Sequence, residues 1–478
     1  MPEKIVGPGL AAGSPQGRWV LAAAVLGSGM ALLDGTVVNI ALRNVGDDLG
    51  ATVAQLQWVV NAYLLALASL ILVGGSLGDH LGRKRVFLVG VTWFAVASTI
   101  CGLAQTPGQL IVARLLQGVG AALLTPGSLA MIQGSFRSAD RGKVIGQWAG
   151  LGGIAAAIGP LLGGWIVDNA SWRWIFLINV PVAVAVLLVA VRHVPESRDP
   201  EAARSFDVAG AALGAAGLGG ATYALIENGS APAAAVLTAA VLGVASLVLF
   251  VVFERRHHDA LVPMHLFASR TFSVANVLTL LVYGALGSML FFLVLQLQVV
   301  TGWTPLKAGL ATIPLTLVML LLSSRSGALA ARIGPRLPLS IGPVLCGAGA
   351  LLLRGVDADT GYLTGVLPGM LVFSSGLVLL VAPLTSSVLA AAPDRFAGIA
   401  SGINNAIART GSLLAVSALP ALVGVSGADY QQPDVFGTGY ARAQLICAVL
   451  LLVGGAVAFV GLRGEPATQV TDDIPQSP

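Results

Sequence analysis

"GSLGDHLGRKR" occupies residues 75–85, directly after an apolar run that is long enough to cross a membrane. "GALAARIGPRL" (327–337) follows another such run, with glycines at equivalent places and a basic residue after its second glycine. A second pair, "LTPGSL" (124–129) and "VAPLTS" (381–386), recurs at nearly the same offset. Chance similarity between Gly-rich loops would explain one such pair, but two concordant pairs indicate a duplicated helical half.

The composition is that of a membrane protein. Hydrophobic residues make up 56% of the 478 residues and charged residues 10%, against about 25% charged residues in a soluble domain. The 60 glycines favour close helix packing in lipid, where the hydrophobic effect no longer drives helices together. Cys101, Cys346 and Cys447 lie in separate apolar runs, so we expect small core residues rather than a metal site or a disulfide framework.

The chain contains fourteen apolar runs of about the 20 residues that a bilayer core requires. The expected spans are 19–41, 54–77, 86–104, 109–132, 144–166, 174–192, 207–227, 232–253, 272–299, 308–330, 338–354, 363–391, 398–424 and 441–462. With both termini in the cytoplasm, eighteen of the 26 Lys and Arg residues fall in inner segments and five, including Arg43 and Arg442, in outer loops. This asymmetry follows the positive-inside rule, and charges so dispersed argue against a nucleic-acid surface.

If spans 1–6 correspond to spans 9–14, the two spans between them are an insertion. The longest polar inner segments, 194–207 and 254–263, flank that insertion. Two six-helix halves with a linker pair form a transporter plan, with the substrate path between the halves near the midplane. We expect a cytoplasmic tail (1–18), an N-terminal half (19–200), two linker helices (201–262), a C-terminal half (263–464) and a disordered cytoplasmic tail (465–478).

Ordered motifs resemble those of the major facilitator superfamily, and specifically of its fourteen-helix drug:proton antiporter branch. "GSLGDHLGRKR" resembles motif A, with His80 where Arg or Lys is usual; "RLLQGVGAALLTP" (114–126) resembles motif B; "GPLLGG" (159–164) resembles the end of the antiporter motif C. "LDGTVVNIAL" (33–42) and "WRWIFLINVP" (172–181) are typical of the branch. Ala155 and Arg43 depart from it, where glycine and proline are common. The resemblance implies an all-α polytopic membrane protein with the major facilitator fold.

The resemblance also implies the function. We expect a monomeric, multi-pass protein of the cytoplasmic membrane that exports lipophilic drugs or antibiotics in exchange for protons by alternating access. Its partners would be a small lipophilic substrate, protons and the lipid bilayer, with the proton gradient as the driving force and no cofactor. A facilitator or proton symporter for a small metabolite is the alternative. We expect no enzyme, because the chain has no His-Glu-x-x-His and no paired intramembrane aspartates, and no G-x-x-x-x-G-K-[ST] of an ATP-driven pump.

Asp34 is a single carboxylate inside the first span, where it costs about 2.5–3.5 kcal/mol. Arg114 lies at the same depth of the fourth span, roughly 10 Å below the outer end, so the two side chains can meet. Gln117, on the same face as Arg114, could bond either partner. A carboxylate that binds a proton according to whether Arg114 is near could couple transport to protons. The alternative is a static ion pair that holds the two helices together.

The remaining motif residues have mechanical roles in the resembled family. Motif A, with Gly75, Asp79, Gly82, Arg83 and Arg85 in place, implies a conformational latch between the halves; a charged loop that obeys the positive-inside rule is the alternative. Motif C has Gly159, Pro160, Gly163 and Gly164. Pro160 removes a backbone donor, and the glycines allow another helix to approach, which generic helix packing would also explain.

A candidate substrate cavity is indicated by polar residues inside apolar spans. The candidates are Asn39, Gln117, Asn404 and Arg409. Arg409 has no acidic residue in the interior of spans 9–14. It could bind an anionic or carbonyl-bearing group of a substrate, or merely backbone oxygens. Since Asp34 is the only carboxylate well inside a span, we expect neutral or weakly acidic aromatic substrates.

Overall fold

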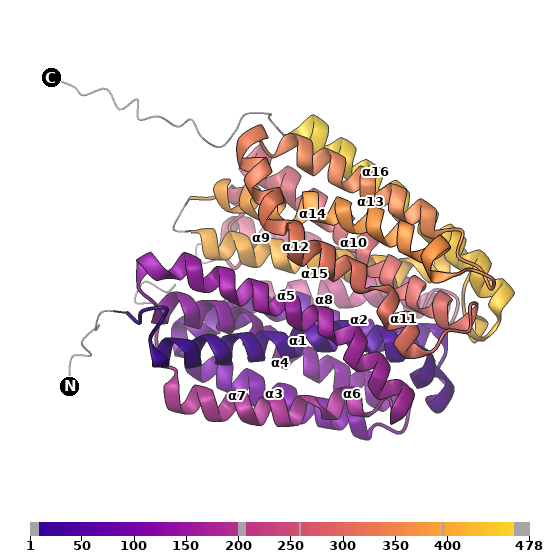
Figure 1. Ribbon diagram of the computed structural model, residues 1–478, viewed down its shortest axis with the longest axis horizontal. Coiled ribbons are helices and arrows are strands. Elements are labelled where there is room, and N and C mark those ends of the chain that lie inside the picture. The colour runs from indigo at the N-terminus through magenta and orange to yellow at the C-terminus, as the bar shows by residue number, and fades with distance from the viewer. Residues whose placement is uncertain (1–8, 199–206, 258–259, 394–395, 463–478) are drawn as a thin grey trace.

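The computed structural model describes residues 9–198, 207–257, 260–393 and 396–462. Over these residues the chain is helical apart from turns and an isolated bridge between Leu10 and Phe136. The expected disordered tail (465–478) lies outside the described residues. Figure 1 shows a bundle in which the first and the last described residues lie at the same end.

Fourteen helical spans in the described ranges are long and apolar enough to cross a membrane, as the sequence predicts. The elements are α1 (Pro15–Leu49), α2 (Val53–Leu81), α3 (Arg83–Leu103), α4 (Pro107–Ser135), α5 (Ser138–Asn169), α6 (Trp174–Leu177), α7 (Asn179–His193), α8 (Val208–Ile226), α9 (Ala233–Arg256), η1 (Met264–Ala268), α10 (Arg270–Val299), α11 (Pro305–Ala311), α12 (Ile313–Ile333), α13 (Arg336–Leu353), η2 (Tyr362–Val366), α14 (Leu367–Ala390), α15 (Ala397–Val423), η4 (Asp429–Gln431) and α16 (Pro433–Gly461). The pairs α6–α7, α11–α12 and η2–α14 each form one span.

Several helices extend beyond the apolar runs that define them in the sequence. Helix α1 begins at Pro15, because the Ser14 hydroxyl caps it by accepting a hydrogen bond from Gly17 N (3.1 Å). The helix therefore begins four residues before the expected span (19–41), and the assignment of 1–18 as a cytoplasmic tail stays a prediction. Arg43 and Arg442, expected in outer loops, lie within α1 and α16. Backbone hydrogen bonding continues a helix past the apolar layer, so hydropathy marks the lipid boundary rather than the helix end.

The helices pack as two groups with a hairpin between them. The first group contains α1–α7, in which α4 packs against α2 and α3, and α5 and α7 against α1. The second group contains α10–α16, in which α10 packs against α15 and α16, and α13 against α14. Helix α8 packs against α9 and also contacts α2 and α15, one helix from each group. Figure 1 shows the first group as one layer and the second as the other.

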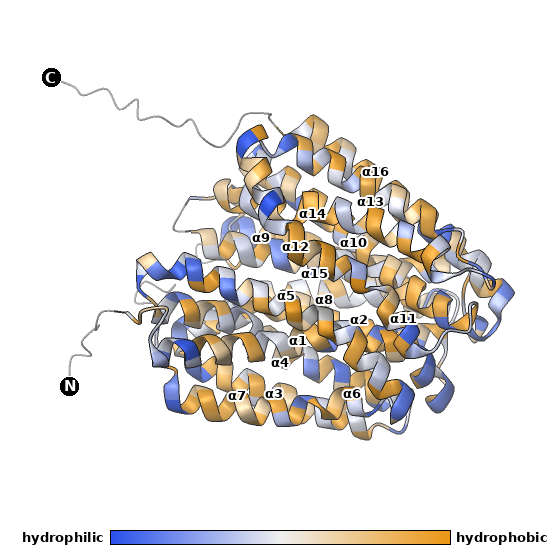
Figure 2. Ribbon diagram, in the orientation of Figure 1, coloured by the Kyte–Doolittle hydropathy of each residue, from blue (hydrophilic) through white to orange (hydrophobic). Residues whose placement is uncertain are grey.

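Apolar residues cover the sides of the bundle and polar residues gather at its ends (Figure 2). The side chains of Leu242 and Val248 on α9 are 61% and 56% exposed, which suits a helix that faces lipid. We call the end where α2 meets α3, with Arg83, Lys84 and Arg85, the basic end. The opposite end, where α1 meets α2 at Leu49–Val53, is the distal end.

Glycines bring α4 against α2 at two depths. A Cβ added to Gly118 would lie 2.5 Å from the Tyr63 carbonyl oxygen, and a Cβ on Gly74 would collide with the Ala122 carbonyl. Close backbone approach without side chains is the usual basis of helix association in lipid. The tight contact fixes α4, and therefore Arg114, relative to α2.

Candidate functional site

A buried ion pair joins α1 to α4 in the middle of the first helical group. Arg114 Nη1 donates to Asp34 Oδ2, and each side chain is only 1% exposed. Arg114 Nε donates to the Val59 carbonyl of α2 (3.0 Å), and its guanidinium carbon lies 4.3 Å from the centre of the Tyr63 ring. The sequence prediction that the two charges can meet is therefore confirmed as a contact. Its role in proton coupling stays a prediction.

Gln117 completes the coordination of both charges. Its Nε2 donates to Asp34 Oδ1 (2.8 Å), and its Oε1 accepts from Arg114 Nη1 (2.7 Å). The same Nε2 also reaches Ser98 Oγ of α3 (3.1 Å), which accepts from Asn179 Nδ2 of α7 (3.0 Å). Both carboxylate oxygens of Asp34 thus have donors, and the network extends through the five helices α1, α2, α3, α4 and α7.

Ser98, Asn179 and Tyr63 belong to this network, and the sequence analysis missed them. Each is a polar side chain in a long apolar run, which was the available signal. What the sequence lacks is the relative rotation of α3, α4 and α7, which decides that Ser98 faces Gln117. A movement of α1 away from α4 would separate Asp34 from Arg114. Leaving either charge buried without its partner costs about 3–5 kcal/mol, so the ion pair is sensitive to helix movement.

Motif A forms the connection between α2 and α3 at the basic end. Asp79 Oδ1 accepts from Arg83 Nε (2.9 Å) and Nη2 (2.8 Å), and Arg85 lies 3.7 Å from Glu196. Gly82 has φ = 111°, and a Cβ there would lie 2.7 Å from the Glu196 carboxylate, so the turn requires glycine.

The contacts of Gly75, Asp79, Arg83 and Arg85 lie within the first helical group and the segment after α7. Gly75 faces Pro126 of α4, where a Cβ would make an ordinary 3.7 Å contact. Within the described ranges, the hydrogen bonds of Asp79, Arg83 and Arg85 stay inside the first group and the segment that follows α7. The latch between halves therefore stays a prediction.

Motif C packs α5 against both helical groups. A Cβ on Gly159 would lie 2.5 Å from Thr36 Oγ1, and one on Gly163 would lie 2.5 Å from Val37, both on α1. A Cβ on Gly164 would lie 2.6 Å from Leu306 Cα of α11. The Pro160 carbonyl faces α11 too, since a Cβ on Gly309 would collide with it. The role in helix packing predicted from the sequence therefore extends to the contact between groups.

The distal end is closed by hydrogen bonds between the two groups. Gln57 Nε2 of α2 donates to the carbonyls of Val416 (2.8 Å) and Ser417 (2.9 Å) of α15. Asn61 Nδ2 donates to Ser417 Oγ (2.9 Å). Gln298 Nε2 of α10 donates to the Ile40 carbonyl of α1 (2.9 Å). Every one of these bonds lies in the distal part of its helices.

Further bonds at the same end join the connecting segments. Val53 N donates to the Gly427 carbonyl (2.7 Å), and the Tyr430 hydroxyl donates to the Ala51 carbonyl (3.0 Å). Leu306 N donates to Asp168 Oδ2 (3.0 Å). At the basic end, the hydrogen bonds and ion pairs of Asp79, Arg83 and Arg85 stay within the first group and the segment after α7.

The four candidate cavity residues fall into separate environments. Gln117 is fully buried within the ion-pair network, so in this conformation it is not free to meet a substrate. Asn404 donates to Asn276 Oδ1 (3.1 Å) and Thr279 Oγ1 (2.7 Å) of α10. Asn39 Oδ1 and Arg409 Nε are buried and have no hydrogen-bond partner. The assignment of these residues to one substrate cavity stays a prediction.

Among the described residues, no three His, Cys, Asp or Glu side chains are grouped so as to hold a metal ion. The three cysteines are buried and free, and Cys101 lies against the network, with its sulfur 3.5 Å from Gln117 Oε1. The buried polar groups of the described residues include the ion pair, its amide partner and the unpartnered atoms of Asn39 and Arg409.

The chain resembles bacterial resistance proteins over most of its length. It is 35% identical to "Puromycin resistance protein pur8" of Streptomyces alboniger, over 96% of this chain and 93% of that protein. It is 34% identical to "Tetracenomycin C resistance and export protein" of Streptomyces glaucescens, over 89% of this chain and 78% of that protein. A third relative is "Methylenomycin A resistance protein" of Bacillus subtilis (strain 168), 33% identical over 93% of this chain and 97% of that protein.

Two solved transporter structures illustrate the likeness in fold. A POT family transporter in complex with 5-aminolevulinic acid superposes with a TM-score of 0.70 at 15% identity, over 94% of this chain and 96% of that chain. A bacterial homologue of the human lysosomal transporter Spinster, in an inward-facing and unoccupied conformation, gives 0.67 at 15% identity, over 94% and 97%. The family model of the Major Facilitator Superfamily matches residues 24–416. With this match, fourteen apolar spans and two packed helical groups, the chain belongs to the Major Facilitator Superfamily.

Proposed function

We propose that this protein is a proton-coupled antiporter that exports lipophilic drugs or antibiotics across the cytoplasmic membrane. The observation that carries the proposal is the buried cluster of Asp34, Arg114 and Gln117. Asp34 stands near the middle of α1, whereas the other acidic residues of the described helices lie within a turn of a helix end. A carboxylate kept at that depth is expensive unless it is paired, and such residues commonly belong to proton relays.

The ion pair could couple the protonation of Asp34 to a movement of α1 relative to α4. When Arg114 and Gln117 donate to Asp34, the carboxylate is stabilised in its charged form. When a proton binds to Asp34, its attraction to Arg114 falls, and α1 is released from α4. Because the network also includes Ser98 and Asn179, a rearrangement at Asp34 would change the packing of α3 and α7 as well. Protonation would thus favour one arrangement of the first group over another.

The contacts between the groups support alternating access. We propose that the two groups are the halves 19–200 and 263–464, that 201–262 links them, and that they rock about a site near the midplane. The distal hydrogen bonds of Gln57 and Asn61 would belong to the state that is closed at the distal end. Motif A would form its latch in the opposite state, when the basic ends of the halves approach.

The distribution of charge supports the orientation. We propose that the basic end faces the cytoplasm, with both termini there, because short loops rich in Lys and Arg stay on that side. Arg83, Lys84 and Arg85 lie at this end. The conformation described above would then be open toward the cytoplasm, where an exporter collects its substrate.

The chemistry of the second half narrows the substrate class. We propose neutral or weakly acidic aromatic compounds, because Arg409 has a buried Nε without a hydrogen-bond partner and the described interior of α10–α16 holds no acidic residue. A cation would meet an unmatched positive charge there. The relatives are named for resistance to puromycin, tetracenomycin C and methylenomycin A. These names support small antibiotics as the broad substrate class.

The experiment that tests the function measures proton movement in liposomes containing the purified protein. A probe compound such as tetracenomycin C or methylenomycin A is added on one side, and internal pH is followed with a trapped dye. An antiporter moves protons opposite to the compound. A symporter, the alternative, moves both in the same direction, and a facilitator moves the compound without changing internal pH. Either of the last two results would reject the proposal.

A double mutant separates a proton switch from a static ion pair. Asp34→Asn and Arg114→Gln should each lower the free energy of unfolding by about 3–5 kcal/mol, because each strands a buried charge. Combining them should recover most of that loss, since no unpaired charge remains. The double mutant should nevertheless stay unable to couple protons, because it has no titrating group. Recovery of coupled transport would show that the pair is only structural.

A further inference from the structure

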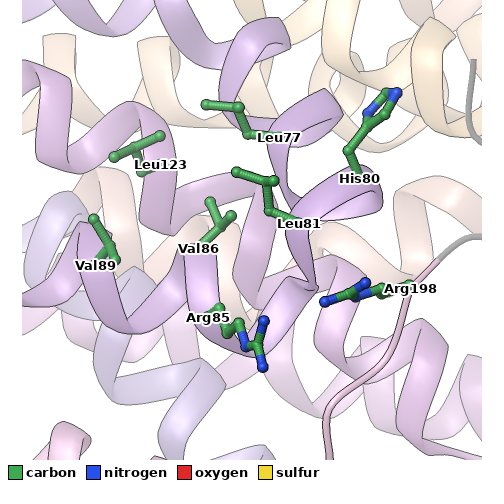
Figure 3. A pocket seen from close by; sticks show the side chains of 8 residues that line it. All are labelled: Leu77, His80, Leu81, Arg85, Val86, Val89, Leu123 and Arg198. Atoms are coloured by element: carbon green, nitrogen blue, oxygen red, sulfur yellow. The ribbon is translucent and has the colours of Figure 1, made fainter. Parts of the chain in front are cut away.

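A cleft on the outside of the first helical group lies beside motif A. It has a volume of about 400 Å³ and opens at the basic end, between α2 and α3 (Figure 3). Leu77 and Leu81 line it from α2, Val86 and Val89 from α3, and Leu123 of α4 lies behind them. The cleft is therefore a groove between two helices with a third helix as its floor.

The apolar part of this groove opens onto the side of the bundle. Leu81 is 55% exposed and Val89 is 58% exposed, and both belong to helical spans that are long and apolar enough to cross a membrane. The floor of the groove is deep because glycines bring the helices together. A Cβ on Gly90 of α3 would lie 2.9 Å from Leu123 Cβ. A hydrocarbon chain lying in the groove would contact apolar side chains on three sides.

The edge of the groove is positively charged. Arg85 and Arg198 line it, and Figure 3 shows their guanidinium groups at one edge, with the apolar side chains on the other side. Arg85 has a weak partner, since Glu196 lies 3.7 Å away and the Arg85 side chain is 70% exposed. Arg198 has no carboxylate within ion-pair distance among the described residues.

The other described charges beside the groove bond to one another or to the backbone. Arg83 is paired with Asp79, and Glu196 accepts a hydrogen bond from Lys84 N (3.1 Å). Lys84 Nζ itself donates to the Val191 carbonyl (2.9 Å). Among the described residues, Arg85 and Arg198 therefore place two guanidinium groups beside the apolar slot.

We propose that this groove binds an anionic phospholipid, with the headgroup phosphate between Arg85 and Arg198 and an acyl chain along Leu81, Val89 and Leu123. A fork of guanidinium donors matches phosphate oxygens, and basic residues near an anionic leaflet favour such lipids. The groove is separate from the ion-pair site, because Leu123 lies nine residues along α4 from Arg114, or about 13 Å. The bound lipid would hold the start of α3 and the segment after α7 together beside motif A.

The test uses native mass spectrometry of the full-length protein, purified in detergent with phosphatidylglycerol or phosphatidylcholine. The wild type should retain phosphatidylglycerol in preference to phosphatidylcholine. Arg198→Gln should weaken phosphatidylglycerol retention about fivefold, the effect of one basic contact to an anionic lipid. Arg192→Gln is the matched control, since it removes the same charge at the same end from a residue that does not line the groove. Retention equal to the wild type in Arg198→Gln would overturn the proposal.

A second variant separates the groove from a general attraction between positive charge and anionic lipid. Val89→Trp fills the apolar slot and leaves both arginines in place, so phosphatidylglycerol should be lost with the charge unchanged. Retention by Val89→Trp would mean that surface charge alone explains binding. Adding inorganic phosphate at millimolar concentration tests whether the groove binds free phosphate rather than a lipid headgroup. Displacement of the lipid by phosphate alone would show a free-phosphate site, whereas continued retention supports a lipid site.

Discussion

The polar residues at the distal end of the bundle have different partners from the motif A charges at the basic end. At the distal end, side chains of α2 and α10 donate hydrogen bonds across the boundary to backbone and side-chain oxygens of α15 and α1. At the basic end, the charges of motif A bond within the first group. The distal contacts are short polar bonds between the two groups, whereas Asp79 and Arg83 of motif A have each other as partners. The latch that motif A is proposed to form would require another conformation.

The polar contacts at the distal end are also individually weak. Hydrogen bonds between membrane helices contribute about 0.6 kcal/mol on average, with a maximum near 1.7. Several such bonds stabilise a closed end without making it permanent, because each contributes little alone. A seal built this way suits a transporter that must open the same end in each cycle.

The largest expected effect comes from locking the distal end. In a variant with the three buried native cysteines replaced by alanine, Asn61→Cys and Ser417→Cys place thiols where the structure has a 2.9 Å hydrogen bond. Cross-linking them with a short bifunctional reagent should abolish transport, because the distal end can no longer open. Reduction of a cleavable linker should restore it. Full transport by the cross-linked protein would contradict opening at this end.

The next effect concerns the packing of α5 against α11. Gly164→Ala places a Cβ 2.6 Å from Leu306 Cα, and such overpacking costs about 1–3 kcal/mol. The distal closed state should be depleted, so cysteines placed near Leu306 should label faster from the distal side. Gly153→Ala in the same helix is the control, since nothing lies within 4 Å of its Cβ. Equal labelling in the two variants would show that motif C does not seal the groups.

A smaller effect is expected from Gln57. Gln57→Leu removes the donor to two carbonyls of α15 and should shift the equilibrium by roughly 1 kcal/mol, or about fivefold. Thermal unfolding should change little, while labelling of distal positions should increase. Gln133→Leu, an exposed glutamine at the basic end of α4, is the matched control. A shift of the same size in both variants would remove the specific role of Gln57.

Asp79→Asn should give the smallest effect in the conformation described. The Asp79–Arg83 pair is partly exposed, and such pairs contribute about 0–1 kcal/mol. Substrate binding should persist, while the fraction of protein that is open at the basic end should rise if motif A latches the opposite state. Labelling of cysteines at basic-end positions measures this fraction. Loss of substrate binding with unchanged labelling would contradict a latch.

The sequence predicted best those contacts that follow from the charge of a side chain and its distance from the end of its helix. The cost of burying Asp34 and Arg114 in lipid, together with their equal distance from the helix ends, predicted a contact that the structure confirms. The fourteen spans followed from apolar length. Helix ends were less accurate, as at Pro15, because capping by Ser14 continues the helix into polar sequence.

The contacts between the halves could not be predicted in the same way. Gln57 and Ser417 are separated by hundreds of residues, and their meeting depends on how the two groups rotate and on which conformation is present. No local pattern encodes that arrangement. The same holds for Ser98 and Asn179, whose contact with the Gln117 network depends on the rotation of α3 and α7.

Substrate-coupled proton flux in liposomes containing Asp34→Asn decides whether Asp34 carries the exchanged proton. Asparagine keeps the size of the side chain but cannot titrate, so flux should fall to the level of protein-free liposomes while the protein stays folded. Asp47→Asn is the control in the same helix, since that side chain is 53% exposed and only weakly paired with Arg43 at 3.8 Å; it should retain wild-type flux. Undiminished flux in a folded Asp34→Asn protein would contradict the account.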